Sequence, residues 1–255
     1  MKNVSGITGK EHSSDSTTPV SAASDAIPPV VAFAGWSGSG KTTLIAKLIP
    51  AIKRIALESG KADFQIGVIK HDAHGIRLTP VESLKEENES WADEEGIIAG
   101  LYTDTEGKDS MVFRKAGADR VALCGPEGIF LSAEDDKTLM RHIVGHAGHE
   151  DAGPEGEQME NSPGPLDQAL QLLQDMDLIL VEGFKNGLLP QIGIARRENG
   201  KGLTARSDRY KAVVTDDPDI REDVRGVPVF GFDQTEELAE CIRLVFIDPH
   251  AAAKR

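Results

Sequence analysis

Short continuous apolar runs alternate along this chain with stretches whose apolar residues recur at helical spacing. Runs that are short, apolar throughout and bounded by polar residues are typical of strands buried on both faces of a parallel sheet. The run at residues 30–34 is apolar throughout, and mainly apolar runs follow at residues 64–69, 119–123, 128–131, 177–181, 191–195, 211–215 and 227–230. The pattern predicts an α/β fold, with a mostly parallel sheet and helices on both faces.

Helical spacing is clearest directly after the first apolar run. Apolar residues recur at three- and four-residue intervals between Leu44 and Ile55, and Gly60 supplies a helix end. Pro50 interrupts this pattern, and a proline inside a helix removes a hydrogen bond, so we expect a kink or a split there. Further helices are predicted at residues 109–118, 166–176 and 235–245.

The connection between the first strand and the first helix carries the strongest chemical signal. Residues 35–42 read G-W-S-G-S-G-K-T, which matches the phosphate-loop pattern G-x-x-x-x-G-K-[ST]. Backbone N–H groups of such a loop and the following helix N-terminus converge on phosphate oxygens, while the lysine reaches the β- and γ-phosphates. We therefore predict a nucleoside triphosphate site with Lys41 as its catalytic residue, formed by Gly35, Trp36, Ser37, Gly38, Ser39, Gly40, Lys41, Thr42 and Thr43.

The predicted strand at residues 177–181 is followed directly by an acid. Glu182 is placed as the carboxylate of a Walker B element, where it would hold Mg²⁺ together with the Thr42 hydroxyl, and Gly183 would offer its N–H to the γ-phosphate. Asp177, at the other end of this strand, reads as a cap. Asp72, after the strand at 64–69, is either another Mg²⁺ ligand or a cap at a strand exit.

Other polar residues near strand ends leave two interpretations open. His71 and His74 either contact phosphate or belong to an ordinary loop. Asp216 follows the strand at 211–215, where an aspartate is able to accept hydrogen bonds from guanine N1 and N2. The Asn-Lys pair that usually precedes such an aspartate is missing, and a turn aspartate before Asp217-Pro218 explains the residue equally well.

Composition narrows the setting of this domain. The formal net charge of −14 argues against nucleic acid or an anionic membrane as the main partner. Both cysteines lie in apolar runs with no metal-ligand spacing, no run is long enough to span a bilayer, and the N-terminus lacks a secretory signal, so we expect a cytoplasmic protein. Residues 1–28 are expected to be a disordered tail before one domain at 29–248.

Two segments inside that domain are predicted to be acidic loop insertions, at about 79–106 and 134–165. The second contains His142, His146, His149 and Glu150. Three histidines and a glutamate suggest a Zn²⁺ or Ni²⁺ site, although exposed histidines in a Gly/Glu-rich segment are the commoner case.

The motifs in this order resemble the MobB family of molybdopterin-guanine dinucleotide biosynthesis adapter proteins. The resemblance rests on G-W-S-G-S-G-K-T-T-L, I-K-H-D-A-H-G, G-K-D-S-x3-R-K-A-G-A, D-L-I-L-V-E-G-F-K and A-V-V-T-D, and covers most of residues 30–245. It implies a P-loop NTPase fold that binds GTP with Mg²⁺, hydrolyses it weakly and forms a homodimer. It also implies a partner, a molybdopterin guanylyltransferase of the MobA type, which attaches GMP to molybdopterin.

The chain departs from the family pattern in its tail and in the two insertions. A P-loop small-molecule kinase and a metal-delivering GTPase are the alternatives. The kinase interpretation requires a basic lid segment, and none is evident in the sequence. Only the histidine cluster supports the metal-delivering GTPase.

Overall fold

The computed structural model describes residues 28–72, 76, 79–80, 97–103, 109–132, 139–144, 164–184, 188–205, 207–224 and 226–249. The predicted disordered tail, His74, His146, His149, Glu150 and most of the two predicted insertions lie outside these residues. Among the described residues, no helix has the length and apolar character needed to cross a bilayer.

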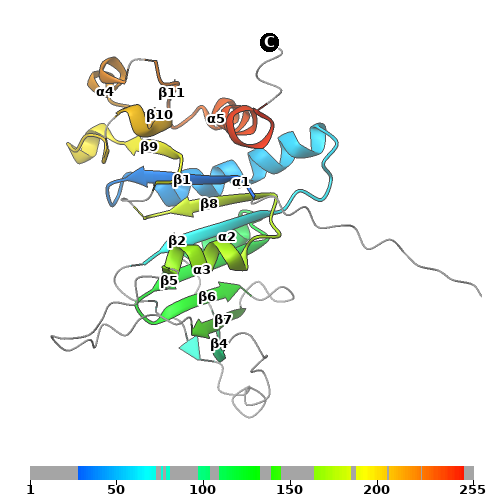
Figure 1. Ribbon diagram of the computed structural model, residues 1–255. Coiled ribbons are helices and arrows are strands. Elements are labelled where there is room, and N and C mark those ends of the chain that lie inside the picture. Colours follow the sequence, from blue (N-terminus) through cyan, green and yellow to red (C-terminus); the bar gives the residue numbers. More distant parts are fainter. Residues whose placement is uncertain are drawn as a thin grey trace, which may run out of the picture.

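Helices separate the strands, which occur singly or in short groups along the described chain (Figure 1). The strands are β1 (Val30–Gly35), β2 (Ile66–His71), β3 (Thr79–Pro80), β4 (Ile97–Thr103), β5 (Arg120–Gly125), β6 (Gly128–Ser132), β7 (Leu139–Val144), β8 (Leu178–Glu182), β9 (Gln191–Ala195), β10 (Tyr210–Thr215) and β11 (Val229–Phe230). The helices are α1 (Lys41–Glu58), α2 (Asp109–Lys115), α3 (Pro165–Leu172), α4 (Pro218–Asp223) and α5 (Thr235–Ile242), with short turns η3 (Arg197–Asn199), η4 (Ser207–Arg209) and η5 (Arg243–Ile247).

These strands form one mixed sheet in the order β11-β10-β9-β1-β8-β2-β5-β6-β7-β4-β3. The pairs from β11 to β5 are parallel, and those from β5 to β3 are antiparallel. The parallel part confirms the α/β prediction. The antiparallel part was not predicted in this form, because β4 and β7 lie in the ranges interpreted as insertions and pair with each other.

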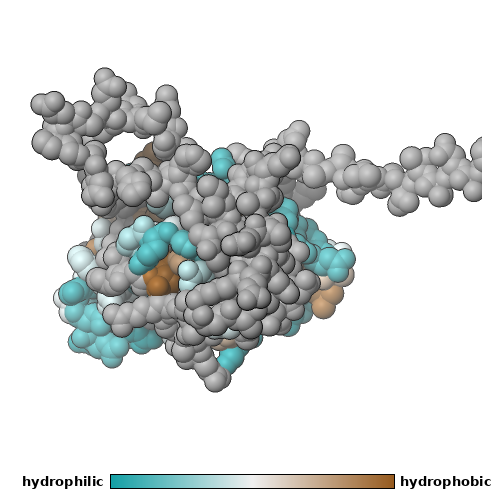
Figure 2. Space-filling view, turned by 90° about the horizontal axis from the view of Figure 1, so that it is seen from below, coloured by the Kyte–Doolittle hydropathy of each residue, from teal (hydrophilic) through white to brown (hydrophobic). Residues whose placement is uncertain are grey.

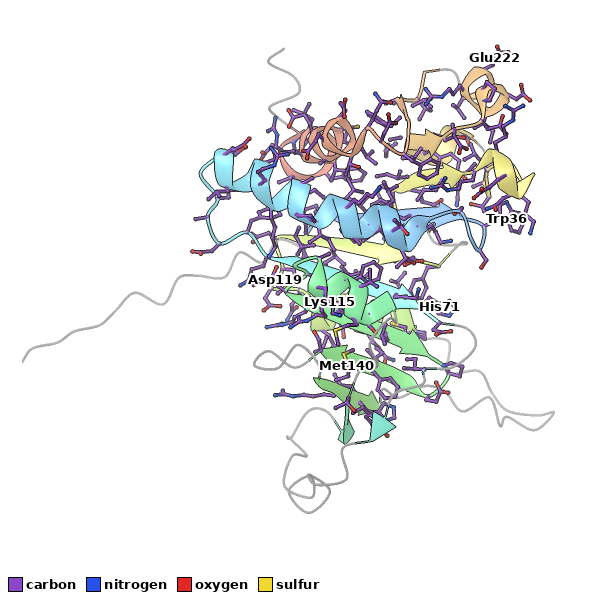
Figure 3. The ribbon with its side chains drawn as sticks, turned by 180° about the vertical axis from the view of Figure 1, so that it is seen from behind. Trp36, His71, Lys115, Asp119, Met140 and Glu222 are labelled. Carbon is purple, nitrogen blue, oxygen red and sulfur yellow. The ribbon has the colours of Figure 1, made fainter. Side chains whose placement is uncertain are left out.

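Helices cover both faces of the sheet, and the side-chain alternation of the strands decides which residues meet them. On β1, Val31 and Phe33 pack into the core formed with α1, α2 and α5, whereas Ala32 faces the core formed with α3. Figure 1 shows α3 on the near side, and Figure 3, seen from behind, brings α1 and α2 to the front. Burial on both faces explains why these strands are mainly apolar.

Helix α1 runs without interruption from Lys41 to Glu58, so the expected split at Pro50 is wrong. Pro50 is exposed. A proline at an exposed position of a helix costs less, because water is able to replace the N–H that proline lacks. Leu48, Ile49 and Ile52 remain fully buried and hold both halves of the helix against the sheet.

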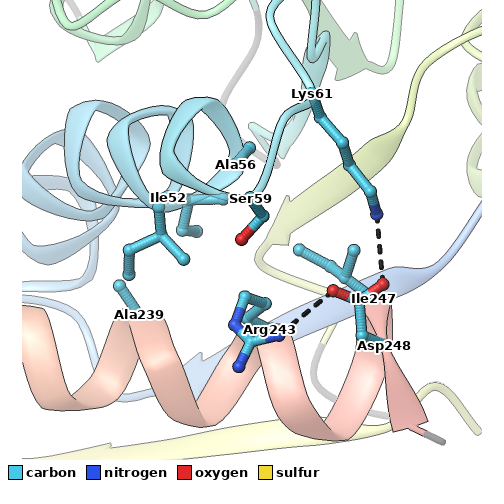
Figure 4. A pocket seen from close by; sticks show the side chains of 9 residues that line it. Ile52, Ala56, Ser59, Lys61, Ala239, Arg243, Ile247 and Asp248 are labelled. Atoms are coloured by element: carbon cyan, nitrogen blue, oxygen red, sulfur yellow. Dashed lines mark hydrogen bonds and ion pairs between the residues drawn. The ribbon is translucent and has the colours of Figure 1, made fainter. Parts of the chain in front are cut away.

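The far end of α1 is closed by the C-terminal segment (Figure 4). A pocket with about 240 Å³ of empty volume, part of it open solvent, lies there between α1 and α5 and is lined by Ile52, Ala56, Ala239 and Ile247. At its rim Asp248 forms ion pairs with Lys61 at 3.1 Å and Arg243 at 3.2 Å. These contacts anchor η5 to the end of α1.

The end of the sheet that carries β7 and β4 is seen from below in Figure 2. In this view the described residues show mostly hydrophilic surface, with smaller hydrophobic areas left of the middle and at the right. The phosphate loop lies elsewhere. Trp36 of that loop and His71 at the end of β2 occupy one edge of the sheet, and Asp119, just before β5, lies at the opposite edge (Figure 3).

Candidate nucleotide site

The phosphate-loop sequence occupies the turn between β1 and α1, as predicted. Gly40 is the N-cap of α1 and has a φ of 87°, in the left-handed region that side chains with a Cβ rarely adopt. No side chain caps the first turn of this helix. The N–H groups of this first turn, with the positive end of the helix dipole, therefore point at the loop.

The Lys41 side chain folds over this loop. Its ammonium group donates to the carbonyl oxygens of Gly35 at 3.0 Å and Trp36 at 2.9 Å. A cation is thus held across the loop next to the N–H groups of the helix start, and the combination is suited to a polyphosphate.

Thr42 and Glu182, predicted to act together, are in contact. The Thr42 hydroxyl lies 3.0 Å from each oxygen of the Glu182 carboxylate, which is only 6% exposed. The contact arises because β8 is the parallel neighbour of β1, so the end of one strand lies beside the loop that follows the other. A hydroxyl and a buried carboxylate are the oxygen ligands that Mg²⁺ prefers.

A third group at this point was not predicted. Lys70 lies opposite Glu182 in the register of β2 and β8, and its ammonium group is 3.6 Å from the Glu182 carboxylate. Because both side chains are largely buried, this ion pair neutralises the carboxylate beside Thr42. The register of two strands far apart in the sequence creates the pair, so composition and spacing carry no signal for it.

The segment that follows β8 touches the last residue of β2. Gly183 has a φ of 110°, and a Cβ added there would lie 2.8 Å from the Cβ of His71. The His71 ring is 4.8 Å from that of Phe184. Asp72 comes directly after β2 at the same edge, and its backbone N–H donates to the Cys124 carbonyl. It takes no part in the hydrogen bonds between Thr42 and Glu182.

Asp216 does not cap the helix that follows it. The N-cap of α4 is Asp217, whose carboxylate accepts from the backbone N–H of Asp219. Asp216 turns instead toward the segment after β9, where it accepts from the Arg197 backbone N–H at 2.8 Å and pairs with the Arg196 guanidinium at 3.7 Å.

This segment after β9 runs alongside the phosphate loop. The indole N–H of Trp36 donates to the Gly202 carbonyl at 3.0 Å, and a Cβ on Gly38 would lie 4.0 Å from Asn199 Oδ1. A Cβ on Gly40 would lie 3.3 Å from Arg196 Nε. Arg196 and Asn199 belong to no sequence motif, although residues just after a strand that pairs with β1 must lie near the loop.

Two buried polar atoms near the loop have no hydrogen-bond partner among the described residues. They are Ser39 Oγ and Asn199 Nδ2. A buried donor without an acceptor is costly, and the Asn199 amide lies beside Gly38. A ligand rich in acceptor oxygens, such as a polyphosphate, is therefore compatible with this wall of the site.

Two other sequence motifs have structural roles. Arg114, from G-K-D-S-x3-R-K-A-G-A, is 3% exposed and donates to the Asp119 carbonyl and the Ser132 hydroxyl, and burial lowers its pKa. His142 stacks on Phe130 at 4.2 Å and contacts the Glu127 carbonyl. Among the described residues no group of three or more histidine, cysteine or acidic side chains is placed to hold a metal.

A parallel α/β sheet with a phosphate loop after β1, and an acidic strand end beside the loop threonine, defines a P-loop NTPase fold. The profile of one family, described as "Molybdopterin guanine dinucleotide synthesis protein B", matches residues 30–95 and 155–216, about half of the chain. The chain belongs to this family, MobB.

Relatives of this chain are named molybdopterin-guanine dinucleotide biosynthesis adapter proteins. It is 28% identical to the molybdopterin-guanine dinucleotide biosynthesis adapter protein of Haemophilus influenzae, over 74% of this chain and 76% of that protein. Identity to the adapter protein of Escherichia coli is also 28%, over 77% and 82%. A crystal structure of a MobB homolog from Bacillus stearothermophilus aligns with a TM-score of 0.36 at 20% identity, over 83% of this chain and 92% of that one. Family membership rests on the sequence matches.

Proposed function

We propose that this protein binds GTP with Mg²⁺ and serves as an adapter in the synthesis of molybdopterin guanine dinucleotide. The observation that carries the proposal is the contact between the Thr42 hydroxyl and the buried Glu182 carboxylate, beside a loop that Lys41 spans. The names of the relatives supply the pathway.

Each group of the site has a role in this proposal. The N–H groups of the loop and of the first turn of α1 bind the phosphates, and Lys41 neutralises the β- and γ-phosphates. Thr42 and Glu182 would hold Mg²⁺, with Asp72 as a further candidate at the same edge, and the ion would neutralise phosphate charge. Gly183 offers a backbone N–H, and Asp216 reads the base.

Slow hydrolysis is part of the same proposal. Rapid hydrolysis requires a residue that orients the attacking water and a cation that stabilises the transferring phosphoryl group. The sequence motifs supply no water-orienting residue, so we assign the protein a holding role with weak GTPase activity.

Titration calorimetry with GTP and Mg²⁺ tests the site. Lys41→Ala is expected to weaken GTP binding at least about tenfold, because it removes charge-assisted hydrogen bonds to phosphate. Lys47→Ala is the matched control, since Lys47 is an exposed lysine of the same helix. Equal GTP affinities of the Lys41→Ala and wild-type proteins would contradict the proposal.

The proposed partner is a molybdopterin guanylyltransferase of the MobA type, bound by a cytoplasmic homodimer of this chain. Co-purification of the two proteins, with and without GTP, tests the partner, and analytical ultracentrifugation tests the dimer. A deletion variant for the acidic segment should remove residues 81–96 only, because 97–103 form β4, which pairs with β7. No co-purification under either condition would count against this partner.

A further inference from the structure

A guanidinium group stands between the phosphate loop and the ends of β10 and β11. Arg196 follows β9 directly, and its Nε and Nη2 atoms would lie 3.3 and 3.4 Å from a Cβ on Gly40. Its Cζ lies over the Phe232 ring, 3.8 Å from the centroid. Contacts on both sides therefore restrict the side chain, which is 29% exposed.

The same guanidinium lies beside a carboxylate that is held from another direction. Asp216 Oδ1 accepts the Arg197 backbone N–H at 2.8 Å, and Asp216 Oδ2 is 3.7 Å from Arg196 Nη1. The Asp216 side chain remains 46% exposed. The 3.7 Å separation is longer than a hydrogen bond, so N–H groups of Arg196 and lone pairs of Asp216 are both able to bind a ligand.

A donor and an acceptor side by side match guanine and oppose adenine. Along one edge guanine presents the O6 acceptor next to the N1–H and N2–H donors, whereas adenine presents an N6 donor next to the N1 acceptor. Arginine facing O6 and aspartate facing N1 and N2 satisfy guanine. With adenine, the arginine donors would face the N6 donor, and the aspartate oxygens would face the lone pair of N1.

We infer that Arg196 determines base specificity at this site by donating to O6 of guanine, next to Asp216. Phe232 holds the guanidinium in place from below, and Gly40 allows it to lie against the phosphate loop because no Cβ intervenes. The inference rests on the proposed nucleotide site and adds a residue that the sequence motifs do not indicate.

A double-mutant cycle tests the contact, in which one change is made in the Arg196 side chain and the other at O6 of the nucleotide. Affinities for GTP and 6-thio-GTP, in which a weakly accepting sulfur replaces O6, are measured with Mg²⁺ for the wild type and Arg196→Met. Methionine keeps an apolar stem on Phe232 but has no donor. We expect the wild type to prefer GTP roughly tenfold, and the Met variant to bind both nucleotides with similar affinity.

Arg197→Met is the matched control, because Arg197 is the adjacent arginine, has an exposed side chain and contributes only its backbone N–H to Asp216. It should keep the wild-type preference. ATP affinity, measured in parallel, should come closer to GTP affinity in Arg196→Met than in the wild type. If circular dichroism shows the Met variant unfolded, Arg196→Gln replaces it and is expected to lower the preference for GTP.

The outcomes separate the two claims. A wild type that prefers GTP over 6-thio-GTP, with the same preference in the Arg196 variant, would overturn the role of Arg196 and leave the nucleotide site intact. A wild type that binds GTP but shows no preference over 6-thio-GTP also overturns it. A wild type that binds no GTP overturns the proposed function and this inference together.

Discussion

The hydrogen bond between Thr42 and Glu182 leads to a prediction about stability as well as function. Thr42→Val replaces the hydroxyl by a methyl group of similar size and leaves a carboxylate that is 6% exposed without that donor. A hydrogen bond to a charged group contributes about 1.5–3 kcal/mol. Because Lys70 still pairs with Glu182 at 3.6 Å, we expect the lower part of this range, about 1.5–2 kcal/mol.

For a domain of this size, 1 kcal/mol corresponds to roughly 2–4 °C, so the melting temperature should fall by about 3–8 °C. Differential scanning calorimetry without nucleotide measures this change. Thr42→Ser keeps a donor and should melt near the wild type, and Thr43→Val, at the exposed neighbouring position, is the control for the Val substitution in the helix. Mg²⁺ with GTP should raise the melting temperature of the wild type and the Ser variant more than that of Thr42→Val. If Thr42→Val melts within about 1 °C of Thr43→Val, the bond contributes nothing to stability and the reasoning is refuted.

Three further predictions concern single residues. Burial raises the pKa of the Cys124 thiol to about 12, so Cys124 of the native protein should not react with a thiol reagent at pH 8. The same thiol should react when the protein is unfolded in guanidinium chloride. Rapid labelling of Cys124 in the native protein would contradict this prediction. Burial acts to raise the pKa of Asp248, but hydrogen bonds from Lys61 and Arg243 hold it below its ordinary value of 3.8. Asp248→Asn should therefore lower the free energy of unfolding above pH 3.8, and the loss should shrink as the pH falls below 3.8. A loss that stays constant down to pH 2 to 3 would show that the charge of Asp248 is not responsible. Gly183→Ala should lower the free energy of unfolding by about 2 kcal/mol or more, because φ is positive there and the added Cβ meets His71. Urea titration measures the change. Gly200→Ala is the control that separates the contact from the backbone strain, because φ is also positive at Gly200 but the space around it is open.

Predictions from the sequence succeeded where local chemistry or strand burial decides the structure. The strand, loop and helix around Lys41 are present, and Asp177 is the cap it was predicted to be, since its carboxylate accepts the Gln65 backbone N–H at 2.7 Å. The expected split at Pro50 did not occur because helix propensity is local, whereas the packing of α1 against the sheet is not. The strand β7 was missed because its partners, β4 and β6, are needed to recognise it.

The sequence alone determined the phosphate loop and the strand that ends in an acid. A glycine pattern followed by Lys41 and Thr42 is typical of phosphate binding, and an apolar run that ends in Glu182 is typical of a Walker B strand. The tertiary structure alone decided what surrounds them. Lys70 meets Glu182 through the register of β2 and β8, and Arg196 meets Gly40 because β9 pairs with β1. Contacts of this kind join residues more than a hundred positions apart, and only the order and register of the strands bring such residues together.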